Sequence, residues 1–185
     1  MQDPQDLSGG ELGSIIYPSA SPFEIHHILC KLGDAVEHPV FGSLLVPESP
    51  PEGRMPCVVA AHGSLNWRGH HHEHIVRWLE QGICVFRVHS FDSRSVYSVV
   101  EDQMQVTHAM MLADCYQALR MLATHPLIDP SKIGIAGWSL GGTVALYAAW
   151  EPVAESLAPS GERFAAHLSF YPAAHMRTEE QRWSS

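Results

Sequence analysis

The chain has 185 residues, of which 45% are hydrophobic, and a mean hydropathy of −0.05. This length and composition predict one soluble globular domain with a core of its own. The 11 basic and 20 acidic residues give a formal charge of −9, which argues against nucleic acid or an anionic membrane as the main partner. Residues 1–13 lack a signal-peptide pattern, and no apolar run approaches the roughly 18 residues of a membrane span. We expect a cytoplasmic protein with a small-molecule partner, in an oligomeric state that the sequence leaves open.

The first part of the chain predicts a lead segment, a hairpin and two central strands. Residues 1–22 are rich in Gly, Ser and Pro and are expected to form a flexible lead. Residues 23–29 and 40–47 are strand-like and are joined by an acidic turn, which predicts an opening hairpin. The continuous apolar runs at 57–61 and 83–88 are typical of buried strands.

Helical patterns follow these two buried runs. Apolar residues recur at helical spacing in 69–81 and again in 109–123. Two further strand-like runs occupy 133–136 and 165–171. Strand and helix therefore alternate, with connections long enough for parallel pairing, and the pattern predicts an α/β fold with a mostly parallel sheet. The four cysteines are widely spaced with no C-x-x-C pair, and we interpret them as reduced thiols.

The motif Gly-Trp-Ser-Leu-Gly-Gly at 137–142 stands at the centre of this organisation. An apolar strand precedes it and an Ala- and Leu-rich helical run follows it, which is the context of a nucleophile elbow. We predict that Ser139 has a positive φ in a sharp strand-to-helix turn, because side chains at Gly137 and Gly141 would clash there. Such a turn exposes the hydroxyl and directs free N–H groups of the next helix at a developing oxyanion. The alternative is a glycine-rich turn whose serine only caps the helix.

Five segments together carry a family resemblance. They are residues 57–63, 90–94, 113–119, 133–142 and 168–172. These segments resemble the dienelactone hydrolase-like branch of the α/β-hydrolases over roughly residues 23–173, which we take as the domain. The resemblance implies an α/β-hydrolase fold with helices on both faces of the sheet. It also implies a hydrolase of carboxylic esters or lactones that uses no cofactor. Dienelactone hydrolase carries cysteine in its elbow where this chain has Ser139, which favours a serine esterase-like relative.

The chain departs from this family after Ser139. The fold orders its catalytic groups as nucleophile, acid and histidine, yet no aspartate follows the serine. We therefore expect a domain truncated after the strand that follows the elbow helix, with residues 174–185 forming an irregular tail. The triad acid and histidine are not identified. His167 lies within a predicted strand and His175 directly after it, where the family has no catalytic histidine.

A serine without a general base is a poor nucleophile. The 185-residue chain is accordingly expected to be inactive or weakly active as a serine hydrolase. The alternative function is a non-catalytic α/β-hydrolase-like binding module that keeps the elbow.

Three residues near the elbow have expected supporting roles. The backbone N–H groups of Leu140 and Ser64 are the predicted oxyanion donors, since a tetrahedral intermediate requires two converging donors. His62 follows the first central strand, and we expect it to order the oxyanion loop.

Arg94 follows the second central strand, at the sheet edge that carries Ser139. Two roles are open for it. Its guanidinium could hold a substrate carboxylate, or it could form a loop ion pair with Asp92 or Asp114.

Residues 70–74 read His-His-His-Glu-His and invite a metal interpretation. The order differs from H-E-x-x-H, and no third ligand is evident downstream. We expect no metal site here and interpret the segment as a solvated helix start.

Overall fold

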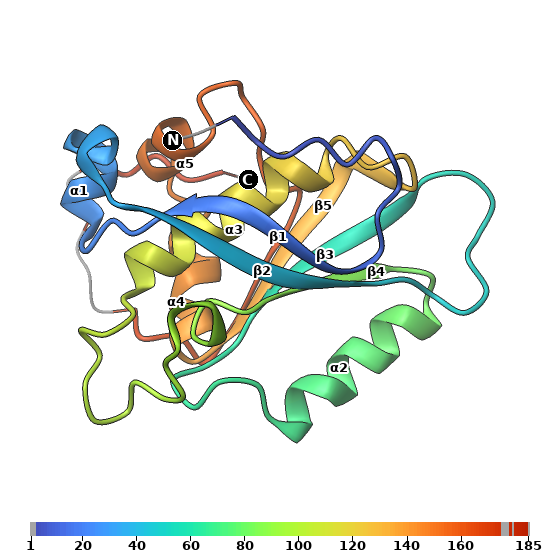
Figure 1. Cartoon of the computed structure of the whole chain (residues 1–185), viewed down its shortest axis with the longest axis horizontal. Coiled ribbons are helices and arrows are strands. Elements are labelled where there is room, and N and C mark those ends of the chain that lie inside the picture. Colours follow the sequence, from blue (N-terminus) through green and yellow to red (C-terminus); the bar gives the residue numbers. More distant parts are fainter. Residues whose placement is uncertain (1–2, 175–177, 179, 185) are drawn as a thin grey trace.

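The computed structural model describes residues 3–174, 178 and 180–184. Within these residues a six-stranded sheet has the order β1-β2-β4-β3-β5-β6 (Figure 1). The strands are β1 (Gly13–Ala20), β2 (Glu37–Leu45), β3 (Met55–Ala61), β4 (Cys84–Val88), β5 (Ile128–Trp138) and β6 (His167–Phe170). Strands β4, β3, β5 and β6 pair in parallel, whereas β2 is antiparallel to both of its neighbours. The sheet is mostly parallel, as the sequence predicted.

Helices cover both faces of this sheet. They are α1 (Ile25–Cys30), α2 (Gly69–Glu80), α3 (His108–Leu122), α4 (Leu140–Tyr147) and α5 (Glu151–Leu157), with short 3-10 turns η1 (Leu32–Asp34) and η2 (Asp92–Arg94). The larger core cluster joins one sheet face to α1, α3, α4 and α5, and the smaller cluster joins the opposite face to α2. Figure 1 shows α2 apart from the other helices, along one side of the sheet. None of the described helices is long and apolar enough to cross a membrane.

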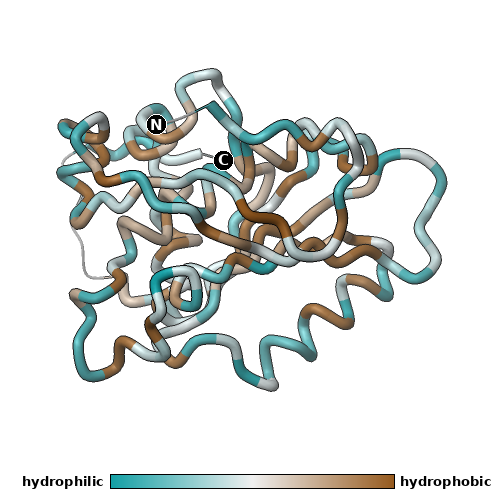
Figure 2. Tube along the Cα trace, viewed as in Figure 1, coloured by the Kyte–Doolittle hydropathy of each residue, from teal (hydrophilic) through white to brown (hydrophobic). Residues whose placement is uncertain are grey.

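Helix α3 is the centre of the larger core. Every residue from Met111 to Leu122 is buried, although the sequence pattern predicted one apolar face. The helix is covered all round because it packs against α4 and α5 as well as the sheet, including its edge strand β1. Thr107 caps its N-terminus, where Oγ1 accepts a hydrogen bond from the Met110 N–H at 3.3 Å. In contrast, hydrophilic and hydrophobic residues alternate along the outer helix α2 (Figure 2).

The expected flexible lead over residues 1–22 is wrong for its second half. Gly13–Ala20 form the edge strand β1, paired with β2 from its first residue to its last. Ile15 and Tyr17 are buried under this strand. Its alternating pattern is easily overlooked because Gly, Ser and Pro interrupt it, and only pairing with β2 makes it a strand.

The opening hairpin is therefore formed by β1 and β2, and the expected strand at 23–29 is also wrong. Helix α1 occupies most of that segment. A local interaction favours the helix, because the backbone N–H of Glu24 donates to Nδ1 of His27 at 3.1 Å. Ile28 is the buried residue of α1.

The described part of the tail forms an isolated β-bridge between Trp183 and Trp150 and packs on the fold. The Arg182 carbonyl accepts from the Glu151 N–H at 3.0 Å, and the Ser184 N–H donates to the Ala149 carbonyl at 2.7 Å. The Trp183 ring lies 6.5 Å from that of Trp150. These contacts tie residues 182–184 to the start of α5.

Candidate active site

Ser139 lies in the strained strand-to-helix turn that the motif predicted. It separates the end of β5 from the start of α4, with φ 54° and ψ −113°. The positive φ is confirmed, and such a conformation costs about 1–3 kcal/mol. The Ser139 N–H donates to the Phe170 carbonyl at 3.0 Å, and its carbonyl accepts from the Thr143 N–H at 2.9 Å. The turn is thus held by both β6 and α4.

The glycines of the motif permit close backbone contacts. A Cβ at Gly137 would overlap the carbonyl of Gly141. A Cβ at Gly141 would lie 2.6 Å from the His62 carbonyl oxygen, and one at Gly142 would lie 2.5 Å from that of Phe170. The Ser139 side chain makes no capping hydrogen bond to α4 among the described residues. The geometry therefore fits a nucleophile elbow and not the alternative of a capping serine.

The loop after β3 runs directly against this elbow. A Cβ at Gly63 would lie 3.2 Å from the Trp138 carbonyl oxygen and 3.5 Å from Cβ of Ser139. Among the described residues, the backbone N–H groups of Ser64 and Leu140 donate no hydrogen bond to another backbone group. Both residues line a cavity together with Ser139. The assignment of these two N–H groups as oxyanion donors stays a prediction.

Two cavities meet at Ser139. One of about 300 Å³ lies beside the starts of α3 and α4 and is lined in part by Phe23, Met104 and Tyr147. The other, of about 420 Å³, lies toward α2. Ser64, Gln103 and Ser139 line both cavities. A group bound at the serine can therefore extend in two directions.

His62 is completely buried beside the oxyanion loop. Its Nδ1 lies 2.9 Å from the Gly63 carbonyl oxygen, and its ring packs against that of Phe91 with centroids 4.3 Å apart. Burial lowers the pKa of His62 to about 4, so the ring is neutral at pH 7. This arrangement supports the expected loop-ordering role, because the imidazole holds the Gly63 peptide.

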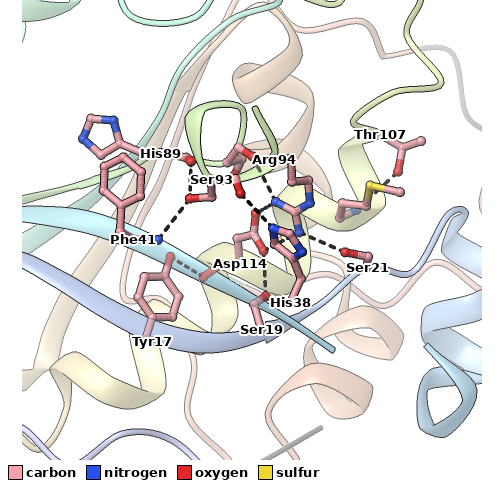
Figure 3. A network of polar contacts seen from close by, with 12 residues as sticks. Tyr17, Ser19, Ser21, His38, Phe41, His89, Ser93, Arg94, Thr107 and Asp114 are labelled. Atoms are coloured by element: carbon pink, nitrogen blue, oxygen red, sulfur yellow. Dashed lines mark hydrogen bonds and ion pairs between the residues drawn. The ribbon is translucent and has the colours of Figure 1, made fainter. Parts of the chain in front are cut away.

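Arg94 forms a buried ion pair with Asp114 (Figure 3). Its Nη1 and Nη2 atoms lie 2.8 and 3.1 Å from the two carboxylate oxygens, and Ser19 of β1 donates to the same carboxylate at 2.6 Å. Arg94 lines neither cavity at Ser139. The substrate-binding role is therefore corrected to the ion pair that the sequence left open, with Asp114 as partner. This pair joins η2, α3 and β1.

The histidine-rich start of α2 is only partly solvated. His71 is buried, its Nδ1 accepts from the Arg68 N–H at 2.9 Å, and its ring lies 4.7 Å from that of Trp138. Burial, with a contribution from His70, lowers the pKa of His71 to about 3. The expected solvated segment is wrong at this position because the first turn of α2 lies on the aromatic side chains of the sheet. Among the described residues, no three His, Cys, Asp or Glu side chains are grouped to hold a metal ion.

A general base for Ser139 is not identified among the described residues. The hydrogen bonds that Ser139 makes to them use its backbone atoms. His167 of β6 packs against Phe164, with ring centroids 6.0 Å apart. His175, the other downstream histidine, lies outside the described residues.

Sequence reasoning overlooked two residues of this site. Thr143 Oγ1 accepts from the Ala173 N–H at 3.0 Å, which fixes the segment after β6 against the elbow helix. Gln103 lines both cavities from a loop without regular structure. The helical position of Thr143, four residues after Ser139, was a usable signal, whereas nothing local to Gln103 indicates where its loop folds.

The comparisons with known proteins agree with this fold. The sequence pattern of the alpha/beta hydrolase fold matches residues 107–185. A Klebsiella pneumoniae protein assigned as a dienelactone hydrolase superimposes with a TM-score of 0.55 and 17% identity, covering 93% of this chain and 65% of that one. The chain has the α/β-hydrolase fold. No curated protein sequence matches it significantly.

A second solved structure is similar over a shorter stretch. It is Est1E from Butyrivibrio proteoclasticus with bound ferulic acid, at a TM-score of 0.51 and 22% identity. The match covers 62% of this chain and 45% of that one. This chain thus covers less than two thirds of the length of each of these two proteins.

Proposed function

We propose that this chain carries the nucleophile and the oxyanion hole of a serine-dependent hydrolase of carboxylic esters or lactones. The observation that carries the proposal is the strained, positive-φ position of Ser139 where two cavities meet. Strain of this kind is retained where it holds a reactive group in place. The similar structures, one assigned as a dienelactone hydrolase and one an esterase, support the ester and lactone class.

Each of these residues has a separate role in the proposed reaction. Ser139 Oγ attacks the carbonyl carbon and gives its proton to a general base, and the new oxyanion accepts hydrogen bonds from the Ser64 and Leu140 N–H groups. Collapse of this intermediate breaks the ester C–O bond, releases the alcohol and leaves an acyl-serine that water hydrolyses. The two cavities hold the acyl and alcohol parts of a small substrate. We propose that the protein itself is located in the cytoplasm.

The alternative is a binding module without catalysis. One observation favours it, because the hydrogen bonds of Ser139 to the described residues involve only its backbone. A module of this kind would hold small esters or acids in the same two cavities and leave them intact.

Acyl transfer from an activated aryl ester tests the proposal on the 185-residue chain. We expect phenolate release little faster than in buffer, because no base is identified, together with slow acylation of Ser139 found by peptide mass spectrometry. Ser139→Ala should abolish that adduct, and Ser98→Ala, in a loop outside both cavities, should keep it.

Two results would change the conclusion. A folded chain that binds the aryl ester but never acquires an acyl group on Ser139 supports the binding module. Robust turnover that depends on Ser139 shows that a base exists within the chain, and His175 and His62 are then the first residues to substitute.

A further inference from the structure

A second serine in the chain is hydrogen-bonded to a histidine and, through it, to an aspartate. Ser43 Oγ lies 3.1 Å from Nε2 of His89, and Nδ1 of the same ring lies 3.1 Å from Oδ2 of Asp92. Ser43 belongs to β2, His89 directly follows β4, and Asp92 is the first residue of η2. None of the three lines a cavity at Ser139. The arrangement is therefore separate from the elbow.

The partners of His89 determine its tautomer. A carboxylate oxygen accepts hydrogen bonds, so Nδ1 carries the proton that faces Asp92. Burial lowers the pKa of His89, which leaves the ring neutral at pH 7 and Nε2 without a proton. Nε2 must then accept the Ser43 hydroxyl proton. This is the orientation in which a histidine acts as general base for a serine.

The aspartate and histidine are themselves held in place. The Asn66 side-chain amide donates to Oδ1 of Asp92 at 2.8 Å, on the carboxylate oxygen that His89 does not use. The Phe41 ring stacks on the His89 ring with centroids 4.7 Å apart and an interplanar angle of 14°. Figure 3 shows these two rings side by side. The orientation of the His89 ring is thus fixed by Asp92 at its edge and by Phe41 on its face.

A cation lies beside the serine. Ser43 and Arg87 are directly paired in the β2–β4 ladder, so their side chains share a sheet face. The Arg87 guanidinium lies 4.6 Å from the centre of the Trp67 ring, and its Nε atom is buried with no hydrogen-bond partner among the described residues. An unpaired donor with a positive charge is suited to an oxyanion.

The sheet face is open on the β1 side of this group. Ile16 of β1 pairs with Phe41 of β2, and its side chain is on the same face. Ile16 is 67% exposed, and the Asp92 side chain is 43% exposed. Ser43 itself is partly exposed, and its paired residue in β1, Ser14, is exposed, so a small reagent can approach the serine from solvent.

We propose that Ser43, His89 and Asp92 form a second nucleophilic site, with Arg87 as its anion-binding group, for activated acyl or phosphonyl electrophiles. In the reaction, the Ser43 oxygen forms a bond to the electrophilic carbon or phosphorus, and its proton moves to Nε2 of His89. The bond to the leaving group breaks, and the leaving group takes the proton from His89. A covalent ester of Ser43 remains.

A fluorophosphonate reagent tests this site in the Ser139→Ala chain, where the elbow cannot react. Trypsin releases residues 32–54, a peptide that contains both Ser43 and the exposed Ser49. We expect the adduct on Ser43, with fluoride as the leaving group, and none on Ser49. Fragment-ion mass spectrometry distinguishes the two serines, so Ser49 is a matched control within the same peptide.

Variants of the base and of its partner separate catalysis from folding. His89→Gln should slow the labelling of Ser43 by about a hundredfold, the range of a lost general base. Asp92→Asn should slow the labelling of Ser43 by a smaller factor. Because the Asp92 side chain is exposed, this variant should fold even if His89→Gln does not. Arg87→Gln should also slow it, while circular dichroism verifies that each variant is folded.

The outcomes are decisive in both directions. Equal labelling of Ser43 and Ser49, or no adduct on Ser43 in a folded chain, overturns the proposal. Labelling of Ser43 that is unchanged by both His89→Gln and Asp92→Asn also overturns it, because the serine would then react without its base. The result at Ser43 is independent of whether Ser139 is acylated by the aryl ester, so each site can fail alone.

Discussion

Gly141 of α4 lies directly on the main chain of His62, so that a Cβ at Gly141 would be 2.6 Å from the His62 carbonyl oxygen. The same hypothetical atom would overlap the carbonyl of Ala61. The elbow helix and the end of β3 therefore touch through backbone atoms alone. This contact fixes the position of Ser139 relative to the Gly63–Ser64 peptide. In the proposed oxyanion hole, the distance between the serine and this peptide must be held constant.

Gly141→Ala should destabilise the fold strongly. The added methyl group meets backbone carbonyls, which cannot rotate away, so α4 or β3 must shift. We expect the free energy of unfolding to fall by about 3 kcal/mol or more in a urea titration. Gly69→Ala is the matched control, because a Cβ there meets nothing within 4 Å. A change below about 1 kcal/mol for Gly141→Ala would contradict the close contact.

Ser139→Ala should leave the fold almost unchanged. The substitution removes a hydroxyl that makes no hydrogen bond to the described residues, and the glycines of the turn stay in place. We expect the free energy of unfolding to change by less than about 0.5 kcal/mol. A thermal or urea titration measures this directly. A loss of several kcal/mol would mean that the serine has a structural role.

Removing one member of the Arg94–Asp114 pair should lower the free energy of unfolding more than replacing both members. Arg94→Ala leaves a fully buried carboxylate without its cation, and we expect a loss of about 3–5 kcal/mol in the free energy of unfolding. The double variant Arg94→Leu, Asp114→Leu removes both charges and should be more stable than Arg94→Ala. If the single variant were as stable as the parent chain, the ion pair would not hold η2 to α3.

The buried His62 should make stability depend on pH. Its pKa is about 4 in the folded chain and near 6.5 when unfolded, so between these values the unfolded state binds a proton that the folded state does not. Stability is therefore full above pH 6.5 and falls as the pH drops toward 4, by up to about 1.4 kcal/mol per pH unit. Urea titrations from pH 7.5 to 4.5 measure the slope.

His62→Asn provides the control for this slope. Asparagine keeps an N–H donor for the Gly63 carbonyl but does not titrate. The slope below pH 6.5 should therefore be shallower in this variant, with the remainder due to other buried histidines such as His71. Identical slopes in the two proteins would show that folding does not lower the pKa of His62.

The sequence alone determined the elements whose signals are local. The apolar runs at 57–61 and 83–88 became β3 and β4, and the helical spacing after each became α2 and α3. The positive φ of Ser139 followed from the glycines on either side of it. A Cβ at Gly137 would overlap the carbonyl of Gly141 only four residues away, whereas the contact that excludes a side chain at Gly141 is with the distant carbonyls of Ala61 and His62. Local sterics and periodicity are visible in a sequence, and for that reason these features could be predicted.

The tertiary structure decided what depends on distant partners. Gly13–Ala20 became a strand because β2 pairs with it, and His71 is buried because Trp138 of a strand 67 positions later lies beneath it. Arg94 took Asp114 as its partner only when α3 packed beside η2. Ser43 and His89 are 46 residues apart, and they meet because β2 and β4 are neighbours in the sheet. Such pairings are set by strand order and helix packing, and no local residue pattern encodes them.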